Sequence, residues 1–159
     1  MAWWGVRPSP TLSMSINTIE ELGQLDATAL REYVEGNKED YTHYGLPIVE
    51  LDDANYAIAF DEVEADEACK GYISDSVWAF NPEFIANCTG LPFEIFKCIA
   101  NSGMCESSNG AILACIEHTC GIDSFVADAI YEDGRGHFLN IWDGDEIVLT
   151  NSNAYAYQV

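Results

Sequence analysis

The sequence predicts an α+β protein in which a small antiparallel sheet carries about five to six helices packed on one face. Three observations lead to this fold class. Before residue 133, several segments combine helix-capping residues with apolar residues at helical spacing. Two short β runs separated by a polar turn indicate a hairpin within residues 48–60. From residue 137 onward the chain changes to strand-like runs, so residues 137–158 are expected to complete the sheet.

Capping residues mark where the helices of the first half begin. A hydroxyl or carboxylate just before a helix accepts a hydrogen bond from a free backbone amide. Thr18 is followed three residues later by Glu21, which completes a capping box. Residues 37–47 are interpreted as a polar connection. The predicted elements are a short helix from residue 19, a helix over 27–35 after Asp26 that ends at Gly36, strands at 48–51 and 56–60 around the turn 52–55, and a helix over 62–80 capped by Asp61.

Proline and glycine divide the second half of the chain. Proline is favoured in the first turn of a helix and glycine just past its end. Asp143-Gly144 is a two-residue hairpin signal, because both positions of such a turn need a positive φ. The predicted elements are helices from Asn81-Pro82 to Gly90, from Leu91-Pro92 to about residue 101, from Ser107 or Ser108 to Gly121 and from Asp123 to about residue 132, then strands at 138–142, 147–149 and 155–157.

The chain is expected to form one α+β domain over residues 15–159, since 159 residues suffice for one hydrophobic core. Residues 1–14 are predicted to be an irregular leader, because Arg7-Pro8-Ser9-Pro10 does not continue a helix. Met14 is an alternative start, and in that case the leader is not native. A hydrophobic share of 48% argues against a disordered acidic tail.

Charge is the most unusual property of the composition. The chain has 27 Asp and Glu against 6 Lys and Arg, a formal net charge of -21. Such a protein repels phosphates, which argues against direct nucleic-acid binding and against anionic membrane surfaces. It attracts cations, or proteins whose working surface is basic, and the expected partner is a basic protein. Nothing in the sequence indicates a cofactor or fixes the oligomeric state.

Six cysteines raise the question of compartment. The first residues lack the basic region and the apolar core of a signal peptide, and no apolar run approaches the length of a membrane span. The expected setting is therefore a reducing cytoplasm, with the cysteines acting as small buried apolar side chains.

The stretch from Asp133 to Glu146 concentrates reactive side chains and glycines. Arg135 provides a guanidinium fork, His137 provides an imidazole, and Asp133 and Asp143 are placed to approach that imidazole. One interpretation is an acid–base or ligand-binding site, and a metal-assisted hydrolase would use these four residues. The alternative is structural: Arg135 pairs with a neighbouring carboxylate and His137 stabilises the turn. The two interpretations differ in whether the side chains converge on one pocket.

Cys105, Cys115, His118 and Cys120 are weak candidates for a zinc site, since thiolates and imidazole are zinc ligands. Their spacing lacks a C-x2-C pair, and Cys115 and Cys120 point apart on a helix. Buried thiols are the alternative, so no metal is predicted.

An acidic run in the first half is the candidate partner-binding surface. Carboxylates on a rigid surface imitate the phosphates of a duplex and so compete for the basic groove of a nucleic-acid-binding protein. The alternative is a solvated face that confers solubility. The candidate residues are Glu50, Asp52, Asp53, Asp61, Glu62, Glu64, Asp66 and Glu67.

The C-terminal segment resembles an uncharacterised family of small acidic proteins from tailed phages and mobile elements. The matching residues are Asp133 to His137 (D-G-R-G-H), Trp142-Asp143-Gly144 with Glu146, and the Tyr155/Tyr157 strand, and residues 64–68 and 78–82 resemble the middle of the family. The resemblance implies a phage or mobile-element source and no particular chemistry. Together with the charge, it favours an accessory protein that inhibits a basic host factor in defence or DNA processing, acting as a DNA mimic rather than as an enzyme. A virion-associated structural subunit is a third possibility.

Overall fold

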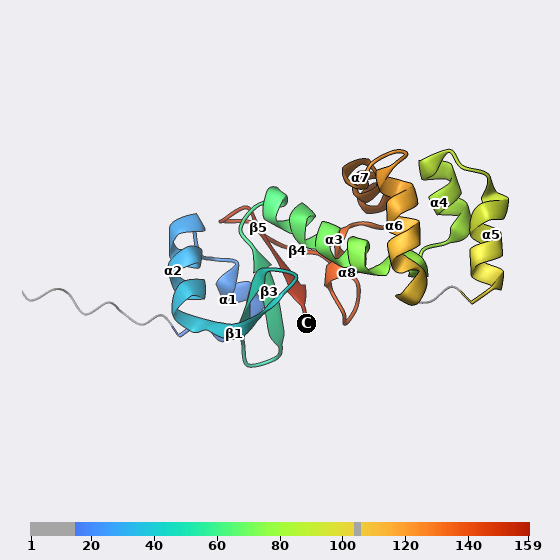
Figure 1. The fold of residues 1–159 in the computed structure, drawn as a ribbon. Coiled ribbons are helices and arrows are strands. Elements are labelled where there is room, and N and C mark those ends of the chain that lie inside the picture. Colours follow the sequence, from blue (N-terminus) through green and yellow to red (C-terminus); the bar gives the residue numbers. More distant parts are fainter. Residues whose placement is uncertain (1–14, 104–105) are drawn as a thin grey trace, which may run out of the picture.

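A computed structural model describes residues 15–103 and 106–159 and shows an α+β fold (Figure 1). Five strands form one antiparallel sheet in the order β1-β2-β3-β5-β4. The strands are β1 (Lys38–His43), β2 (Leu46–Glu50), β3 (Asn55–Ala59), β4 (Ile147–Leu149) and β5 (Ala154–Gln158). The α-helices are α1 (Ile19–Leu22), α2 (Ala27–Asn37), α3 (Glu62–Ser76), α4 (Pro82–Thr89), α5 (Phe93–Asn101), α6 (Asn109–Glu117), α7 (Ile122–Asp133) and α8 (Arg135–Leu139), with 3-10 turns η1 (Val77–Ala79) and η2 (Glu106–Ser108).

Apolar side chains cover both faces of the sheet. Along β3, Tyr56 and Ile58 pack into one hydrophobic cluster with residues of α1 and α2, whereas Ala57 and Ala59 pack into another with residues of α3, α7 and α8. Successive side chains of a strand point to opposite faces, so a strand that is apolar at every position needs cover on both. The α+β class and the antiparallel sheet are confirmed, but the helices lie on both faces and not on one.

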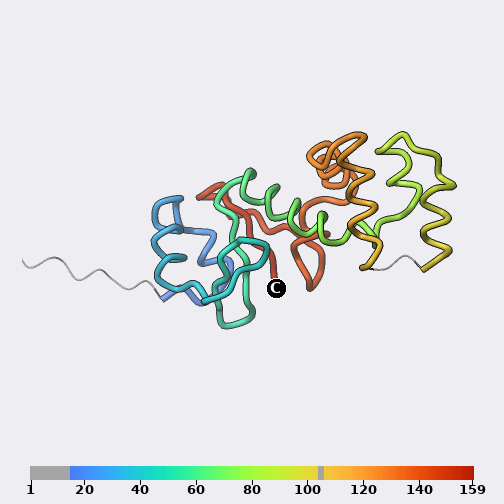
Figure 2. Tube along the Cα trace, in the orientation of Figure 1, coloured from blue at the N-terminus to red at the C-terminus, as the bar shows by residue number. Residues whose placement is uncertain are grey.

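The helix α3 extends from the sheet to a group of helices at the far end of the molecule (Figures 1 and 2). One hydrophobic cluster runs along this whole length, from Ile48 and Tyr157 in the sheet to Phe96 in α5 and Ile112 in α6. The single-domain expectation for residues 15–159 stays a prediction. The leader, residues 1–14, lies outside the described residues.

Several elements begin as the capping residues predict. The Thr18–Glu21 capping box is present at α1, and the side chains of Asp26, Asp61 and Asn81 accept hydrogen bonds from amides of the first turns of α2, α3 and α4. The hairpin within 48–60 and the strands at 147–149 and 155–157 are also present. The helix expected over 62–80 ends as α helix at Ser76 and continues as η1.

Two segments differ from the sequence expectation. Residues 38–43 form the edge strand β1, which is joined to β2 by a tight turn in which Tyr44 (φ 49°) and Gly45 (φ 86°) both have positive φ. The polar and largely exposed side chains of β1 carry no alternation, so the sequence gives no strand signal there.

The second difference concerns the strand expected at 138–142, where the chain forms the short helix α8 and then a loop. Phe138 and Leu139 are both buried, which adjacent residues achieve on a helix packed between α3 and β5. Asp143-Gly144 therefore lies in the α8–β4 loop and does not turn a hairpin; β4 pairs with β5 instead.

Candidate functional site

Arg135, at the start of α8, is the centre of an ion-pair cluster. Its Nε and Nη2 donate to the two carboxylate oxygens of Glu146, at 2.7 and 3.0 Å, and its Nη1 donates to Oδ1 of Asp66 at 3.3 Å. The side chains of Arg135 and Glu146 are only 13% and 23% exposed to solvent. A forked pair of this kind is the geometry in which arginine and carboxylate bind most strongly.

Two tyrosines of β5 complete this cluster. The guanidinium carbon of Arg135 lies 4.4 Å from the centre of the Tyr155 ring, and the hydroxyl of Tyr157 donates to Oε2 of Glu146 at 2.5 Å. The hydrogen bonds to Glu146 raise the pKa of Arg135, and burial followed by the hydrogen bond to Glu146 raises the pKa of Tyr157. The arginine therefore stays charged and the tyrosine stays protonated at physiological pH.

The neighbouring thiol is not activated. Burial, and then the charge of Asp66, raises the pKa of Cys69 to about 12. A reactive cysteine needs a lowered pKa, because the thiolate is the nucleophile. The cluster has the properties of a structural network that links α8 to α3 and β5.

The four residues proposed for an acid–base site do not come together. His137 is exposed and lines a hollow of about 190 Å³ with Asp133, Tyr72 and Phe80. Residues two apart on a helix point about 200° apart, so His137 and Arg135 face different sides of α8. Asp143 is exposed in the following loop, where its Oδ1 accepts from the Asp145 amide at 3.0 Å.

One residue that shapes this region, Asn140, is not among the residues that the sequence singles out. Asn140 is 5% exposed; its Oδ1 accepts from the amides of Trp142 and Asp143, at 2.9 and 3.1 Å, and its Nδ2 donates to the Asp145 carbonyl at 2.7 Å. A buried asparagine is stable only when its side chain is hydrogen-bonded, and here it holds the loop. The sequence signal for a buried asparagine is its position directly after the apolar residues Phe138 and Leu139.

Among the described residues, no three His, Cys, Asp or Glu side chains form a group that could hold a metal ion. Cys115 and Cys120 are partly buried thiols that pack against the hydrophobic core, and His118 is exposed. Cys105 lies outside the described residues.

The predicted acidic run divides into two groups at opposite ends of β3. Glu50, Asp52 and Asp53 surround the β2–β3 turn, and the other five belong to the first turns of α3. Several of these carboxylates have structural partners: Asp53 accepts from the Tyr56 hydroxyl, Asp61 from the amide of Glu64, Glu62 from the Tyr155 hydroxyl, Glu64 from the amide of Phe60, and Asp66 from Arg135. Glu67 has no ion pair within the described ranges and faces an open groove.

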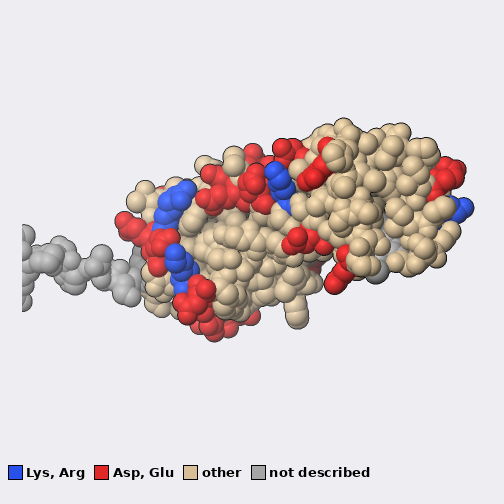
Figure 3. All heavy atoms as spheres, viewed as in Figure 1, with Lys and Arg blue, Asp and Glu red and all other residues tan. Residues whose placement is uncertain are grey.

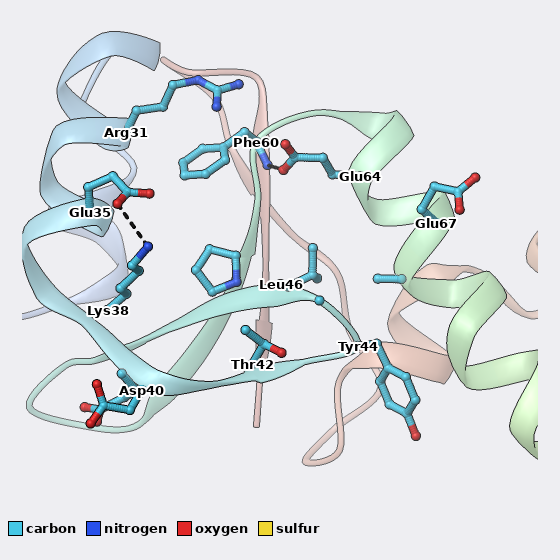
Figure 4. A pocket seen from close by; sticks show the side chains of 14 residues that line it. Arg31, Glu35, Lys38, Asp40, Thr42, Tyr44, Leu46, Phe60, Glu64 and Glu67 are labelled. Carbon is cyan, nitrogen blue, oxygen red and sulfur yellow. Dashed lines mark hydrogen bonds and ion pairs between the residues drawn. The ribbon is translucent and has the colours of Figure 1, made fainter.

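This groove, which we call the α2–α3 groove, has a volume of about 1020 Å³ and lies between α2, β1, the start of β2 and α3 (Figure 4). Its floor includes Leu46, Pro47 and Phe60. Five carboxylates and two cations line it: Glu35, Glu39, Asp40, Glu64 and Glu67, with Arg31 and Lys38.

Both cations of the α2–α3 groove already have partners. Lys38 Nζ lies 3.0 Å from Glu35 Oε2, and the Arg31 guanidinium lies 4.3 Å from the centre of the Phe60 ring. Glu39, Asp40 and Glu67 form no ion pair within the part of the chain that the structure describes. On the face in Figure 3, carboxylates gather over the sheet end and along α3, while the α4–α7 end is mostly neutral. The groove therefore has an excess of negative charge beside an apolar floor.

His43 connects the edge strand to the candidate region. Its Nε2 lies 2.9 Å from the carbonyl oxygen of Leu139, and its side chain is partly buried. Burial lowers the pKa of His43, opposed in part by the hydrogen bond to Leu139. The imidazole is therefore held neutral and donates its N–H to that carbonyl.

We expect His43 to destabilise the fold in acid, because protonation places a charge on a partly buried imidazole. The unfolded chain binds a proton at His43 near the ordinary pKa of 6.5, whereas the native state binds it only at lower pH. The stability that neutral His43 contributes is therefore complete above pH 6.5 and is lost as the pH falls through the native pKa. Urea unfolding from about pH 7.5 to about pH 5 should show a steeper loss of stability for the wild type than for His43→Gln, which keeps an N–H donor. The exposed His118→Gln is the control; a His43→Gln profile parallel to the wild type would contradict the prediction.

Comparisons with known proteins add no relative: no protein-family model matches the chain, and neither a curated protein nor a solved structure matches it significantly. No helix in the described ranges is long and apolar enough to cross a membrane alone; residues Glu106–Glu117 and Ile122–Asp133 meet the length and composition criterion only as a pair bent by 104°.

Proposed function

We propose that the protein is an acidic accessory protein of a phage or mobile element that binds and inhibits a basic, nucleic-acid-binding protein in the cytoplasm of the host cell. The observation that carries this proposal is the α2–α3 groove, a hollow of about 1020 Å³ bordered by carboxylates that form no ion pair with any residue the structure describes. Lysine and arginine side chains that normally hold phosphates are attracted by the same charge. The source rests on the resemblance of the C-terminal segment.

The groove suits a basic side chain with a long aliphatic stem. Glu39, Asp40 and Glu67 supply negative charge, while the half-buried side chains of Pro47 and Phe60 line the groove beside them. Lysine and arginine bury their methylene groups on apolar surface and keep the charged end on polar groups. Association of this kind is fast at low salt and weakens as salt screens the charges.

The proposal is tested with two variants that each remove three negative charges. The groove variant is Glu39→Gln/Asp40→Asn/Glu67→Gln, and the control changes three exposed glutamates of the helical end, Glu83→Gln/Glu94→Gln/Glu117→Gln. Each protein is immobilised and exposed to nuclease-treated bacterial lysate in about 50 mM NaCl, a salt at which charge contacts are strong. Retained proteins are identified by mass spectrometry and challenged with a DNA duplex of about 20 bp.

We expect the wild type and the control variant to retain a nucleic-acid-binding protein that duplex DNA displaces, and the groove variant to lose it. Higher salt should release it from the wild type and from the control variant. Retention of no such protein by the wild type would contradict the proposed function. Equal losses in the two variants would show that net charge, and not the groove, determines the binding.

A further inference from the structure

The loop between α8 and β4, residues 140–146, exposes two large apolar side chains. Ile141 and Trp142 are 68% and 78% exposed. The loop projects from the body of the molecule beside the C-terminal strand (Figures 1 and 2). Large exposed aromatic residues are common at the centres of protein interfaces, where tryptophan and arginine contribute most of the binding energy.

The conformation of this loop is fixed before any partner binds. The buried side chain of Asn140 makes three hydrogen bonds to loop backbone atoms, and the Ile141 amide donates to the Gln158 carbonyl at 3.0 Å. Gly136 packs directly against the backbone of residues 144–146. A loop with a fixed backbone loses little backbone entropy on binding, so the place of Trp142 on the surface is preorganised.

The surroundings of Trp142 are acidic. Asp143 and Asp145 follow it in the loop and are exposed. Burial raises the pKa of Tyr56 to about 12, and the hydrogen bond and charge of Asp53 and, more weakly, the charges of Glu20 and Asp143 add to that shift. The loop therefore presents apolar surface within a negative potential.

These features indicate which kind of partner the α8–β4 loop binds. A second copy of the chain would bring another -21 charge to the same place, and an anionic membrane is repelled in the same way. Arginine combines an aliphatic stem, which Ile141 can cover, with a planar cation that stacks on aromatic rings and pairs with carboxylates. The chain itself uses this combination where Arg135 lies over Tyr155 and pairs with Glu146.

We propose that the α8–β4 loop binds an arginine side chain of a basic partner, with the guanidinium stacked on the Trp142 indole and paired with Asp143 or Asp145. This contact goes beyond the proposed function and does not need the α2–α3 groove. It adds a preference for arginine over lysine, which a groove that binds by charge alone does not supply.

The test compares nona-arginine and nona-lysine peptides, which carry equal charge, by isothermal titration calorimetry. Trp142→Leu is expected to weaken nona-arginine binding by about 3- to 5-fold and to leave nona-lysine binding nearly unchanged. The control is Tyr131→Leu, which removes an 88% exposed aromatic residue beside Glu132 on α7 and should change neither affinity. In NMR spectra of the wild type, the indole N–H signal assigned to Trp142 should shift with nona-arginine.

Several outcomes would overturn the arginine contact. These are an unchanged affinity of Trp142→Leu for nona-arginine, an equal loss for both peptides, and a dimer in sedimentation experiments that Trp142→Leu dissociates. The groove variant separates the two proposals, because it should weaken both peptides alike and keep the preference for arginine. Since Trp142 is mostly exposed, thermal unfolding should confirm that Trp142→Leu is folded.

Discussion

Gly136→Ala is expected to lower the free energy of unfolding by about 3 kcal/mol, because the new methyl group has no room. A Cβ at this position would overlap the Gly144 carbonyl oxygen and approach the Asp145 carbonyl carbon and the Glu146 amide nitrogen, both at 2.7 Å. All three are backbone atoms, so a side-chain rotation does not relieve the contact. The loop or α8 has to move, which also disturbs the Arg135–Glu146 pair. Urea unfolding monitored by circular dichroism measures the effect.

Gly110→Ala is the matched control for this prediction. Gly110 lies in the first turn of α6, and a Cβ there has no described atom within 4 Å apart from its chain neighbours and the backbone of its own helix. Alanine is the better helix former, so this variant should gain about 0.5–1 kcal/mol. If Gly136→Ala were as stable as the wild type, the close packing of α8 against residues 144–146 would be wrong.

Arg135→Gln is expected to cost about 2–3 kcal/mol, the second large effect. The substitution leaves Glu146, a mostly buried carboxylate, without the guanidinium that neutralises it. It also removes the cation from the Tyr155 ring. In a double-mutant cycle with Glu146→Gln, the two losses should be strongly non-additive, with a coupling of about 1–3 kcal/mol.

An exposed ion pair provides the comparison. Lys70 Nζ lies 2.7 Å from Asp123 Oδ1, but the Asp123 side chain is 84% exposed. Exposed pairs contribute little, because solvent already screens both charges. Lys70→Gln should therefore leave the unfolding midpoint nearly unchanged. Equal effects of Lys70→Gln and Arg135→Gln would mean that the Arg135 cluster does not stabilise the fold.

The parts of the fold that the sequence predicted correctly are determined by local interactions. Asp26 and Asp61 cap their helices through hydrogen bonds to amides three residues away. The strand β1 was missed because its side chains are mostly solvated, and only its pairing with β2 makes it a strand. The sequence predicts a strand at 138–142, where the last residues of α8 lie instead, because the conformation of α8 depends on contacts with residues 144–146 that no local pattern indicates.

The contacts of the candidate site were likewise predictable from the sequence only in part. That Arg135 pairs with a carboxylate was anticipated, but the carboxylates belong to Glu146 and Asp66, which the chain brings close only after β4 and α3 are in place. The exposure of Trp142 likewise depends on Asn140, whose side chain fixes the loop. Charge is a property of composition, so the expectation of a basic partner needed no structure.

The strand order has a consequence for synthesis in the cell. β3 pairs with β2 on one side and with β5 on the other, where Ala59 lies opposite Tyr155. A ribosome has to make every helix from α3 to α8 before β3 receives its second neighbour. Until then one side of β3 offers unpaired amides and carbonyls to other nascent chains, and the many carboxylates nearby help to keep those chains apart.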